Sequence, residues 1–476
     1  MSQFPTQLLI DGQWRSTPAK SLSQTNPATN EVFAEVSSAS AADMNDAVLG
    51  AQRAFSAGWR DLAPGKRTGL LFNIARVLRE NAESIAQLEC RNIGKPIADA
   101  RDEVALGARV FEYYAGAIGK FFGHTIPVAR GGFDFTLHQP MGVVAAIVPW
   151  NFPFPIACWK VAPALAAGNC VVLKPASLSP LTALLLGQFA LAAGLPPGAL
   201  QVVPGAGTEV GDALVTHPAV RKISFTGSTA IGSRIMGLAA RDIKRVSLEL
   251  VGKSPNIVFA DADWEQAADS SPMSVFANTG QDCCARSRMF VERAIFQPFA
   301  ERFIAATKKL KIGDPTLDAT QIGPMVSAGQ RASVEQFLTE ATAAGRKSAV
   351  GGGRPLEKGC YLEPAVFLDV EPQDRVWREE VFGPVVCLRP FDDEAAMIEE
   401  VNASPYGLSG SLWTNDLRRA LRVASRIESG VLSVNSHSSV HAEAPFGGFK
   451  QSGLGRDLGM AALEGYTELK NIYVAV

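Results

Sequence analysis

The stretch Gly142-Val143-Val144-Ala145-Ala146-Ile147-Val148-Pro149-Trp150-Asn151 contains an unbroken apolar run that stops at a proline. Such a run is typical of a strand buried on both faces, and the proline is typical of a rigid loop after it. The run opens a series in which strand-like and helix-like segments alternate. Alternation of this kind predicts a parallel sheet with helices on both faces, and ligands bind such sheets at the carboxyl ends of the strands.

The alternation continues on the carboxyl side of this stretch. The predicted strands lie near residues 143–148, 170–174, 200–203, 221–225 and 245–250. The predicted helices lie near 158–167, 180–193, 207–216 and 229–240. On the amino side, Ala-rich segments with apolar residues three and four apart predict helices over 41–59, 65–87 and 98–120. We expect these three helices to cover one face of the sheet, with a short edge strand at Leu8-Leu9-Ile10.

A second series of helices and strands follows residues 255–259, with strands predicted near 288–292, 384–388, 408–413 and 431–434. It predicts a second α/β domain. Two segments fit neither domain. Residues 125–139 alternate around Gly131-Gly132 and predict a β-hairpin, and residues 469–476 predict a terminal strand.

Length and composition limit the classes of protein to consider. A chain of 476 residues is longer than one hydrophobic core usually organises, which predicts two domains. Its 47% hydrophobic and 19% charged residues are typical of a soluble globular protein. The net charge of −2 gives no electrostatic reason to expect nucleic acid or an anionic membrane, so we predict neither as a partner.

The cysteines and the amino terminus bear on metals and on location. The seven cysteines are an odd number without C-x-x-C or Cys/His metal spacing, so we expect reduced thiols and no metal site. Residues 1–11 contain no basic region followed by an apolar core. The apolar runs near 141 and 190 are interrupted by Pro or Gly well short of a bilayer span. The expected location is cytoplasmic.

Three segments contain candidate catalytic residues. The segment 276–287 places Cys283 after a Gly-Gln turn, where a thiolate could attack a carbonyl carbon and N–H groups could hold the oxyanion. A buried, inert cysteine pair is the alternative, and this loop alone leaves both open. The Asn151 amide, at the end of a strand, is an oxyanion donor candidate. Glu249 lies within an alternating strand, where a carboxylate is costly unless paired or chemically useful, so it is a general-base candidate.

Together these segments resemble the NAD(P)-dependent aldehyde dehydrogenase superfamily over nearly the whole chain. The resemblance implies two doubly wound α/β domains, one for the cofactor and one for the nucleophile, plus a small β oligomerisation element and a homodimer or homotetramer. The implied ranges are 1–121 and 141–249 for the dinucleotide-binding domain, 250–465 for the catalytic domain, and 122–140 with 466–476 for the oligomerisation hairpin and strand. The reactive thiol of the family stands two residues after the Gln, which selects Cys283 over Cys284.

The resemblance also implies the order of steps. Cys283 attacks the aldehyde while Asn151 and the Cys283 N–H hold the oxyanion, hydride leaves for nicotinamide, and Glu249 activates the water that hydrolyses the thioester. Glu468 matches a residue that relays the proton outward. In one departure, the family's Glu-Leu-Gly-Gly or Glu-Leu-Ser-Gly is Glu249-Leu250-Val251-Gly252 here. A β-branched residue resists positive φ, so Val251 could displace Glu249 and slow deacylation.

The cofactor is implied to be NAD or NADP. Phe225-Thr226-Gly227-Ser228 joins a strand to a helix, so N–H groups and a hydroxyl point at one spot that suits a pyrophosphate, although such a cap is also common without a ligand. No G-x-G-x-x-G fingerprint follows a predicted strand. Ser177 stands where NAD-preferring members commonly carry Glu, and a serine does not repel a 2′-phosphate, so NADP acceptance is predicted. The predicted cofactor-binding residues are Trp150, Lys174, Ser177, Gly207, Gly211, Gly227, Ser228, Leu250, Glu380 and Phe382.

The substrate is predicted to be an uncharged aromatic or medium aliphatic aldehyde. The predicted tunnel wall comprises Phe154, Cys158, Trp159, Val440 and Phe446. Succinate-semialdehyde members carry an Arg where Trp159 stands, so a carboxylate-tailed substrate lacks its anchor. Two alternatives stay open. One is a CoA-acylating semialdehyde dehydrogenase, against which Glu249 argues, and the other is a dehydrogenase-like binding or structural protein with weak turnover, which Val251 favours.

Overall fold

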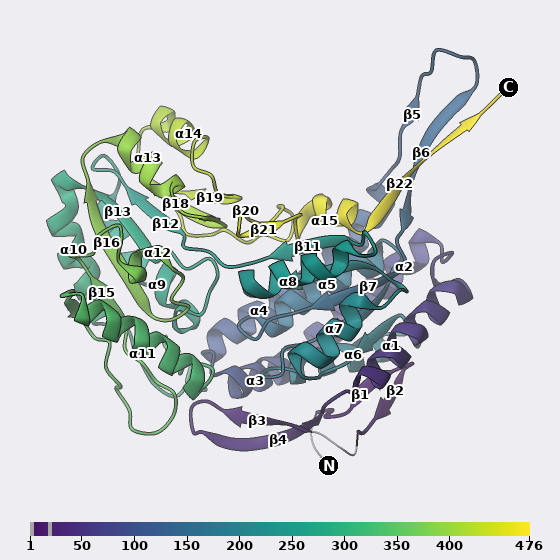
Figure 1. Cartoon of the computed structure of the whole chain (residues 1–476), viewed down its shortest axis with the longest axis horizontal. Coiled ribbons are helices and arrows are strands. Elements are labelled where there is room, and N and C mark those ends of the chain that lie inside the picture. The colour runs from purple at the N-terminus through teal and green to yellow at the C-terminus, as the bar shows by residue number, and fades with distance from the viewer. Residues whose placement is uncertain (1–3, 18–20) are drawn as a thin grey trace.

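The computed structural model describes residues 4–17 and 21–476, so residues 1–3 and 18–20 of the predicted range 1–121 lie outside it. Two α/β units lie side by side, and a narrow arm projects from one of them (Figure 1). The predicted α/β class with two sheets is confirmed. Within the described ranges, no helix combines the length and the apolar character that crossing a bilayer requires.

The first unit is built on a sheet whose central strands are parallel. Its strands are β1 (Leu8–Ile10), β2 (Gln13–Arg15), β7 (Val143–Ile147), β8 (Cys170–Lys174), β9 (Leu200–Val202), β10 (Val220–Thr226), β11 (Arg245–Glu249) and β21 (Gly453–Leu454). In the part of the chain that is described, their order is β2-β1-β9-β8-β7-β10-β11-β21. The strands from β9 to β11 in this order pair in parallel and match the predicted strands to within one residue at each end.

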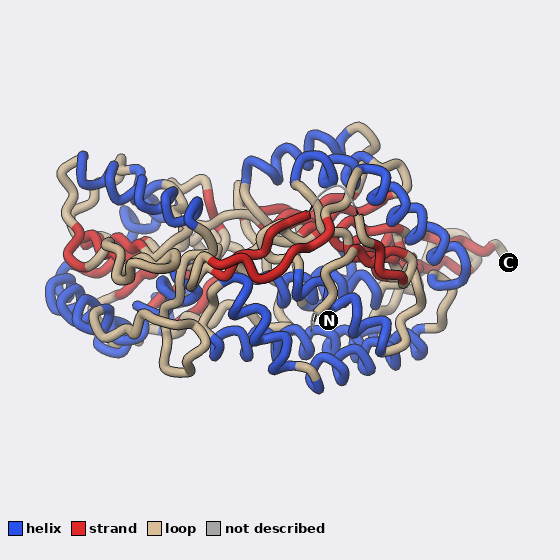
Figure 2. Tube along the Cα trace, turned by 90° about the horizontal axis from the view of Figure 1, so that it is seen from below, coloured by secondary structure: helices blue, strands red, loops and turns tan. Residues whose placement is uncertain are grey.

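Helices cover both faces of this sheet (Figure 2). They are α1 (Ala41–Ala54), the π-helical segment Phe55–Trp59, α2 (Pro64–Glu80), α3 (Ala82–Ile93), α4 (Ile97–Ala117), α5 (Pro153–Ala166), α6 (Leu181–Ala192), α7 (Gly207–Thr216) and α8 (Thr229–Ala240). The single helix predicted over 65–87 is wrong, because Asn81 leaves the helical region (φ −111°) and its side chain bonds the Val77 carbonyl. Helix α5 begins earlier than predicted, since a proline at the first helical position loses no hydrogen bond.

The second unit contains its own parallel sheet with an antiparallel edge strand. The strands are β12 (Pro255–Val258), β13 (Arg288–Glu292), β14 (Ser348–Val350), β15 (Ala365–Phe367), β16 (Val385–Phe391), β18 (Ser409–Trp413) and β19 (Val431–Val434). The helices are α9 (Trp264–Phe276), α10 (Arg293–Thr307), α11 (Ala328–Ala343), α12 (Arg375–Arg378), α13 (Glu394–Asn402) and α14 (Leu417–Ala424). Among the described residues the strand order is β14-β15-β16-β13-β12-β18-β19. An apolar cluster packs on each face of the sheet.

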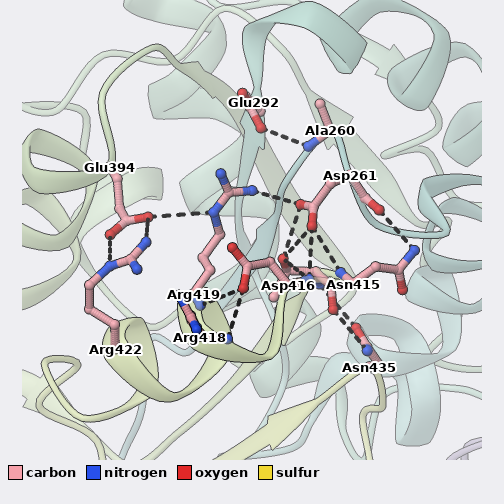
Figure 3. Close-up of polar contacts among 11 residues, drawn as sticks. Ala260, Asp261, Glu292, Glu394, Asn415, Asp416, Arg418, Arg419, Arg422 and Asn435 are labelled. Atoms are coloured by element: carbon pink, nitrogen blue, oxygen red, sulfur yellow. Dashed lines mark hydrogen bonds and ion pairs between the residues drawn. The ribbon is translucent and has the colours of Figure 1, made fainter.

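Asp261, in the segment after β12, bonds the turn between β18 and helix α14 (Figure 3). Its carboxylate accepts hydrogen bonds from Thr414 Oγ1 (2.8 Å) and from the backbone N–H groups of Asn415 and Asp416, and it pairs with Arg419. Asp416 in turn caps the amino end of α14. These contacts join the segment after β12 to the turn between β18 and α14.

The projecting arm consists of β5 (Thr125–Ile126), β6 (Phe133–Pro140) and β22 (Thr467–Val474) in the order β22-β6-β5. The predicted hairpin and terminal strand therefore pair with each other, in register from Thr467 opposite Pro140 to Val474 opposite Phe133. A separate hairpin of β3 (Ser21–Asn26) and β4 (Glu31–Ser37) lies along the edge of the molecule beneath both units (Figure 1). A short ladder joins β17 (Tyr406–Gly407) to β20 (Phe449–Lys450).

The chain returns to the first unit before it enters the arm. Although the predicted range 250–465 assigns this segment to the second domain, β21 pairs with β11, and α15 (Gly459–Gly465) packs on α5. Phe446 and Leu463 belong to the first apolar core. The edge of β11 needs a hydrogen-bonding partner and α15 buries an apolar face, which together account for the return. As a result, residues near 447 lie beside the end of β11.

Candidate active site

Cys283 follows a left-handed turn at the end of α9. In this turn Asn278 and Thr279 have φ values of 49° and 57°, and Gly280 has a φ of 70°. Non-glycine residues in this region cost about 1–3 kcal/mol each, so surrounding contacts must hold them. A Cβ on Gly280 would lie 2.2 Å from the Gly383 carbonyl oxygen. The turn is therefore seated directly on the loop that carries Glu380.

Amide hydrogen bonds lock this turn to the loop after β7. Asn278 Nδ2 donates to the Asn151 carbonyl (2.9 Å), and Asn151 Nδ2 donates to the Gln281 carbonyl (3.0 Å). The Gln281 side chain donates to the Asn278 carbonyl and accepts from the Val326 N–H. Asn151 and Gln281 are both buried. Hydrogen bonds therefore join the two loops that carry Asn151 and Cys283 directly.

A buried ion pair supports Asn151 from the first unit. Lys95 is fully buried, pairs with the Glu103 carboxylate, and donates to the Asn151 carbonyl (3.1 Å). Its ammonium also lies over the Phe152 ring, 4.1 Å from the centroid. Burial raises the pKa of Glu103 to about 8, against the opposing effect of Lys95. Sequence reasoning missed both Lys95 and Asn278, because neither contact is visible before the loops are folded together.

Two cavities meet at Cys283. The first has a volume of about 210 Å³ and is lined by Glu103, Leu106, Phe152, Pro155, Ile156, Trp159, Thr226, Glu249, Leu250, Asp282, Cys283, Cys284, Leu408, Ser439, Val440 and Phe446. The second has a volume of about 270 Å³ and is lined by Pro149, Trp150, Asn151, Thr226, Gly227, Ser228, Leu250, Val251, Cys283, Gln330, Glu380 and Phe382. Thr226, Leu250 and Cys283 line both cavities. The thiol can therefore meet one molecule from each side.

Aromatic and aliphatic side chains dominate the first cavity, which we call the apolar cavity. The Trp159 and Phe446 rings meet edge to face with centroids 5.4 Å apart. Trp159, Val440 and Phe446 line it as the sequence predicts. Phe154 and Cys158 do not.

The error at Phe154 and Cys158 concerns the face of α5 that meets the cavity. Both side chains are fully buried and lie against Gly107 of α4. Residues 154 and 158 are four apart and share the face that packs on α4, whereas residues 155, 156 and 159 line the cavity. The cavity is lined by Phe152, Pro155 and Ile156 in place of the predicted Phe154 and Cys158.

Glu249 ends β11 and faces the apolar cavity from a buried position. Neither of its oxygens has a hydrogen-bond partner among the described residues. Burial raises the pKa of this carboxyl well above its ordinary value, Asp457 raises it further, and Lys160 opposes the rise. A Cβ on Gly447 would lie 2.6 Å from Glu249 Oε1, so only glycine permits this close approach of the returning chain. The Glu249 carboxyl is therefore enclosed by the protein and has no hydrogen-bond partner among the described residues.

The second cavity, which we call the polar cavity, combines rings with hydrogen-bonding groups. The Trp150 and Phe382 rings meet edge to face at 5.3 Å. Glu380 accepts a hydrogen bond from the Gly252 N–H (3.1 Å), and burial raises its pKa to about 8. Ser228 caps the amino end of α8 with its side chain. The structure brings together six of the predicted cofactor residues here, namely Trp150, Gly227, Ser228, Leu250, Glu380 and Phe382.

The other four predicted cofactor residues lie beyond this cavity, after β8 and β9. Lys174 is buried at the end of β8, where burial lowers its pKa to about 8. A Cβ on Gly211 would lie 3.8 Å from Lys174 Cε, so these two residues face each other. Ser177 Oγ donates to the Gly205 carbonyl (3.1 Å), and Gly207 begins α7. These residues form a second group at the carboxyl end of the same parallel sheet.

Comparisons with known proteins agree with this geometry. A model of the "Aldehyde dehydrogenase family" matches residues 14–472. The chain belongs to the aldehyde dehydrogenase family. It is an NAD(P)-dependent oxidoreductase that acts on an aldehyde group. It is 41% identical to the phenylacetaldehyde dehydrogenase of Pseudomonas fluorescens, over 99% of this chain and 96% of that protein.

Solved structures of family members have the same fold. An NAD+ complex of an aldehyde dehydrogenase from Bacillus cereus superimposes with a TM-score of 0.97 at 39% identity, covering 99% of this chain and 97% of that one. The indole-3-acetaldehyde dehydrogenase of P. syringae, in complex with NAD+ and IAA, gives 0.98 at 40% identity, covering 100% and 97%.

The residue that departs from the family motif fits without strain. Val251 does not have a positive φ, so the expected conflict between a β-branched residue and this backbone is wrong. Its carbonyl accepts a hydrogen bond from Ser452 Oγ (2.6 Å), and the Leu250 N–H donates to the Ser452 carbonyl (2.9 Å). Val251 lines the polar cavity. The backbone next to Glu249 is therefore held in place by the returning segment.

Glu468, the predicted proton-relay residue, has an ion-pair partner of its own. It lies on the exposed strand β22 and pairs with Arg245 at 2.9 Å. The charged residues that do affect the pKa of Glu249 include Asp457, Lys160 and Arg456. Lys160 and Asp457 form a buried pair at 2.9 Å, and Lys160 also donates to Ser224 Oγ. A lysine within the apolar run of α5 was the signal in the sequence that could have identified this pair.

Proposed function

We propose that this chain oxidises an uncharged aromatic aldehyde to the carboxylic acid through a thioester on Cys283. The observation that carries the proposal is the position of Cys283 at the junction of the two cavities. On one side lies an apolar cavity with an unpartnered carboxyl, and on the other lies a polar cavity in the cofactor half of an NAD(P)-dependent fold. A thiol that was merely buried would not open on both.

The polar cavity fits the nicotinamide end of the cofactor. Thr226 Oγ1 is a buried hydroxyl without a partner among the described residues, and Thr226 lines both cavities. Trp150, Glu380 and Phe382 would hold the nicotinamide ribose and ring, and Gly227 with Ser228 would hold a phosphate at the amino end of α8. NAD(P)+, when bound, supplies the acceptor for the hydride that the hemithioacetal loses.

Cys283 and Asn151 carry the first half of the reaction. The thiolate adds to the aldehyde carbon, and the resulting oxyanion accepts hydrogen bonds from the Asn151 amide and the Cys283 N–H. An amide has two N–H groups, and Asn151 commits one of them to the Gln281 carbonyl. The second N–H is left for the oxyanion, and the contacts of Lys95 and Asn278 with the Asn151 carbonyl hold the backbone that carries this amide.

Glu249 carries the second half of the reaction. A carboxylate with a raised pKa is a stronger base toward water than an ordinary one. Glu249 faces the same apolar cavity as Cys283, so a water between them would lose its proton to Glu249 and attack the thioester carbon. The buried Lys160–Asp457 pair beside it adjusts the charge that this carboxyl meets. A CoA-acylating enzyme would have no use for this carboxyl.

The walls of the apolar cavity favour an aromatic aldehyde. Trp159 and Phe446 offer ring edges and faces, and the described residues that line the cavity include no arginine or lysine. Relatives named for phenylacetaldehyde and indole-3-acetaldehyde support the same choice. A substrate with a carboxylate tail would lose its hydration without gaining a cation.

An aldehyde panel tests this proposal. We expect kcat/KM for phenylacetaldehyde to exceed that for succinic semialdehyde by about a hundredfold, or about 2.7 kcal/mol. Trp159→Arg should narrow this ratio, and Trp159→Phe is the matched control that keeps the ring. Equal kcat/KM for the two aldehydes in the wild type would contradict the proposed substrate class.

The arm supports a proposed homodimer or homotetramer. Phe133, Leu469 and Val474 expose 63%, 59% and 44% of their surface on the arm. An isolated three-stranded arm with exposed apolar side chains is stabilised when another surface covers it. Light scattering coupled to gel filtration should show a mass of two or four chains, whereas a monomer at micromolar concentration would contradict the proposal.

A further inference from the structure

Asp282, Cys283 and Cys284 bring three ligand atoms together. One carboxylate oxygen and the two sulfur atoms all lie within 4.8 Å of one another. We propose that this cluster binds a thiophilic divalent cation, with Zn²⁺ as the probe, and that the bound ion shuts off the nucleophile.

The donor set selects the class of metal. Two of the three donors are sulfur, which favours Zn²⁺ and similar ions over Mg²⁺ and Ca²⁺, whose ligands are oxygen. Zn²⁺ takes four ligands, and its Zn–S distances are about 2.3 Å. Three protein donors therefore leave one position for water. The ion would replace the protons of both thiols and the carboxyl. The cysteine spacing in the sequence does not match any common metal motif, because the donors come from consecutive residues.

The backbone already orients the cluster. The Cys284 N–H donates to Asp282 Oδ1 (2.8 Å), which turns the carboxyl back toward the two thiols. Arg286 bonds the Cys284 carbonyl from a buried position and fixes the peptide that follows. The turn at residues 278–280 fixes the peptide that precedes the cluster. Little ordering is therefore left for the ion to impose, which favours binding.

The position of the cluster predicts which ligand the ion excludes. Among the described residues, Asp282 and Cys284 line the apolar cavity and not the polar one, whereas Cys283 lines both. An ion held by all three therefore lies on the apolar side of the thiol. This step rests on the proposed function, in which the aldehyde enters from that side. Zn²⁺ should compete with the aldehyde and leave cofactor binding unchanged.

Direct binding to the full chain tests the site without reference to activity. The protein is kept reduced with a phosphine, freed of metal, and titrated with Zn²⁺ against a chromophoric chelator. We expect one Zn²⁺ per chain. Cys284→Ser and Asp282→Asn should each weaken the affinity by about tenfold or more. Cys360→Ser is the matched control, because this buried thiol bonds Asn30 Oδ1 far along the chain and should change nothing. Unchanged affinity in Cys284→Ser, or an equal loss in Cys360→Ser, overturns the proposal.

A reagent on the wild-type protein covers the case in which a variant does not fold. Phenylarsine oxide bridges neighbouring thiols, so prior treatment should abolish Zn²⁺ binding, and a dithiol that removes the arsenical should restore it. Zn²⁺ binding that persists after this treatment overturns the site.

Inhibition kinetics then test the placement of the ion. Zn²⁺ should raise the apparent KM for the aldehyde without raising that for the cofactor. Competition with the cofactor instead would place the ion in the polar cavity and contradict the cluster. If no aldehyde is oxidised at all, the proposed function fails, and the direct titration still decides the metal site.

Discussion

The two cavities beside Cys283 each contain a buried glutamate, and the two carboxyls are treated differently. Glu380, on the polar side, accepts a hydrogen bond from the Gly252 N–H, and its pKa is raised to about 8. Glu249, on the apolar side, has no partner among the described residues, and burial raises its pKa well above the ordinary value. A carboxyl with a partner is suited to holding a ligand, and one without is suited to exchanging a proton. We therefore assign cofactor binding to the polar side of the Cys283 thiol and proton exchange to the apolar side.

Removal of the shared thiol should have the largest effect, because both sides depend on it. Cys283→Ala should lower dehydrogenase and esterase rates by about four orders of magnitude or more. Cys284→Ala, which keeps Cys283 in place, should retain both activities. Rates measured with phenylacetaldehyde and with a nitrophenyl ester check this. Full activity in Cys283→Ala would remove the thiol from the mechanism.

Replacement of the unpartnered carboxyl should stop the second half of the reaction and spare the first. Glu249→Gln should lower the steady-state rate by about 10²-fold or more while a burst of reduced cofactor remains. The matched variant Glu380→Gln, on the polar side, should raise the KM for the cofactor. A loss of the burst in Glu249→Gln would mean that Glu249 acts before the thioester forms.

The same carboxyl should set the pH dependence. Because its pKa is raised, Glu249 is protonated and inactive as a base at low pH, and the hydrolysis rate should rise as pH passes upward through that raised pKa. Single-turnover deacylation from about pH 5 to 9 measures this rise, and Glu249→Gln should flatten it. A wild-type profile that is flat over the range, or that falls with rising pH, would contradict a carboxylate base.

A change at Ser177, which lies beyond the polar cavity, should alter the preference between NAD and NADP without stopping aldehyde oxidation. Ser177 lies in the loop after β8 and donates a hydrogen bond to the Gly205 carbonyl. A glutamate at position 177 would repel a 2′-phosphate. Ser177→Glu should shift the ratio of kcat/KM values toward NAD by about tenfold, or about 1.4 kcal/mol. Ser177→Gln is the uncharged control. An unchanged ratio would place Ser177 away from the ribose.

The smallest effect is expected at Val251. Because its φ is not positive, replacement by glycine relieves no strain, and Val251→Gly should change the steady-state rate by less than about threefold. A large rise in rate, together with loss of a wild-type burst, would show that the valine does hinder Glu249.

The sequence predicted those parts of the molecule that depend on local pattern. The apolar runs that became β7 and β8 are buried along their whole length, so hydrophobicity alone marks them. The position of Cys283 two residues after Gln281 is likewise a local feature that the sequence alone displays.

The remaining features depend on how distant segments meet. The error at Phe154 and Cys158 arose because packing against α4 decides which face of α5 meets the cavity. The roles of Lys95, Lys160 and Asp457 required folded contacts, since each partner lies on another element. Glu468 resembles a relay residue in sequence, and in the structure it pairs from the arm strand β22 with Arg245 at the start of β11.

The central claim is that an acyl group is carried by Cys283 and released by Glu249. The most direct test is to mix Glu249→Gln protein with phenylacetaldehyde and NAD+, quench it in acid, and determine the modified residue by peptide mass spectrometry. We predict one phenylacetyl thioester per chain, on Cys283, which accumulates in the variant and turns over in the wild type. An unmodified Cys283, or an acyl group on Cys284, would contradict it.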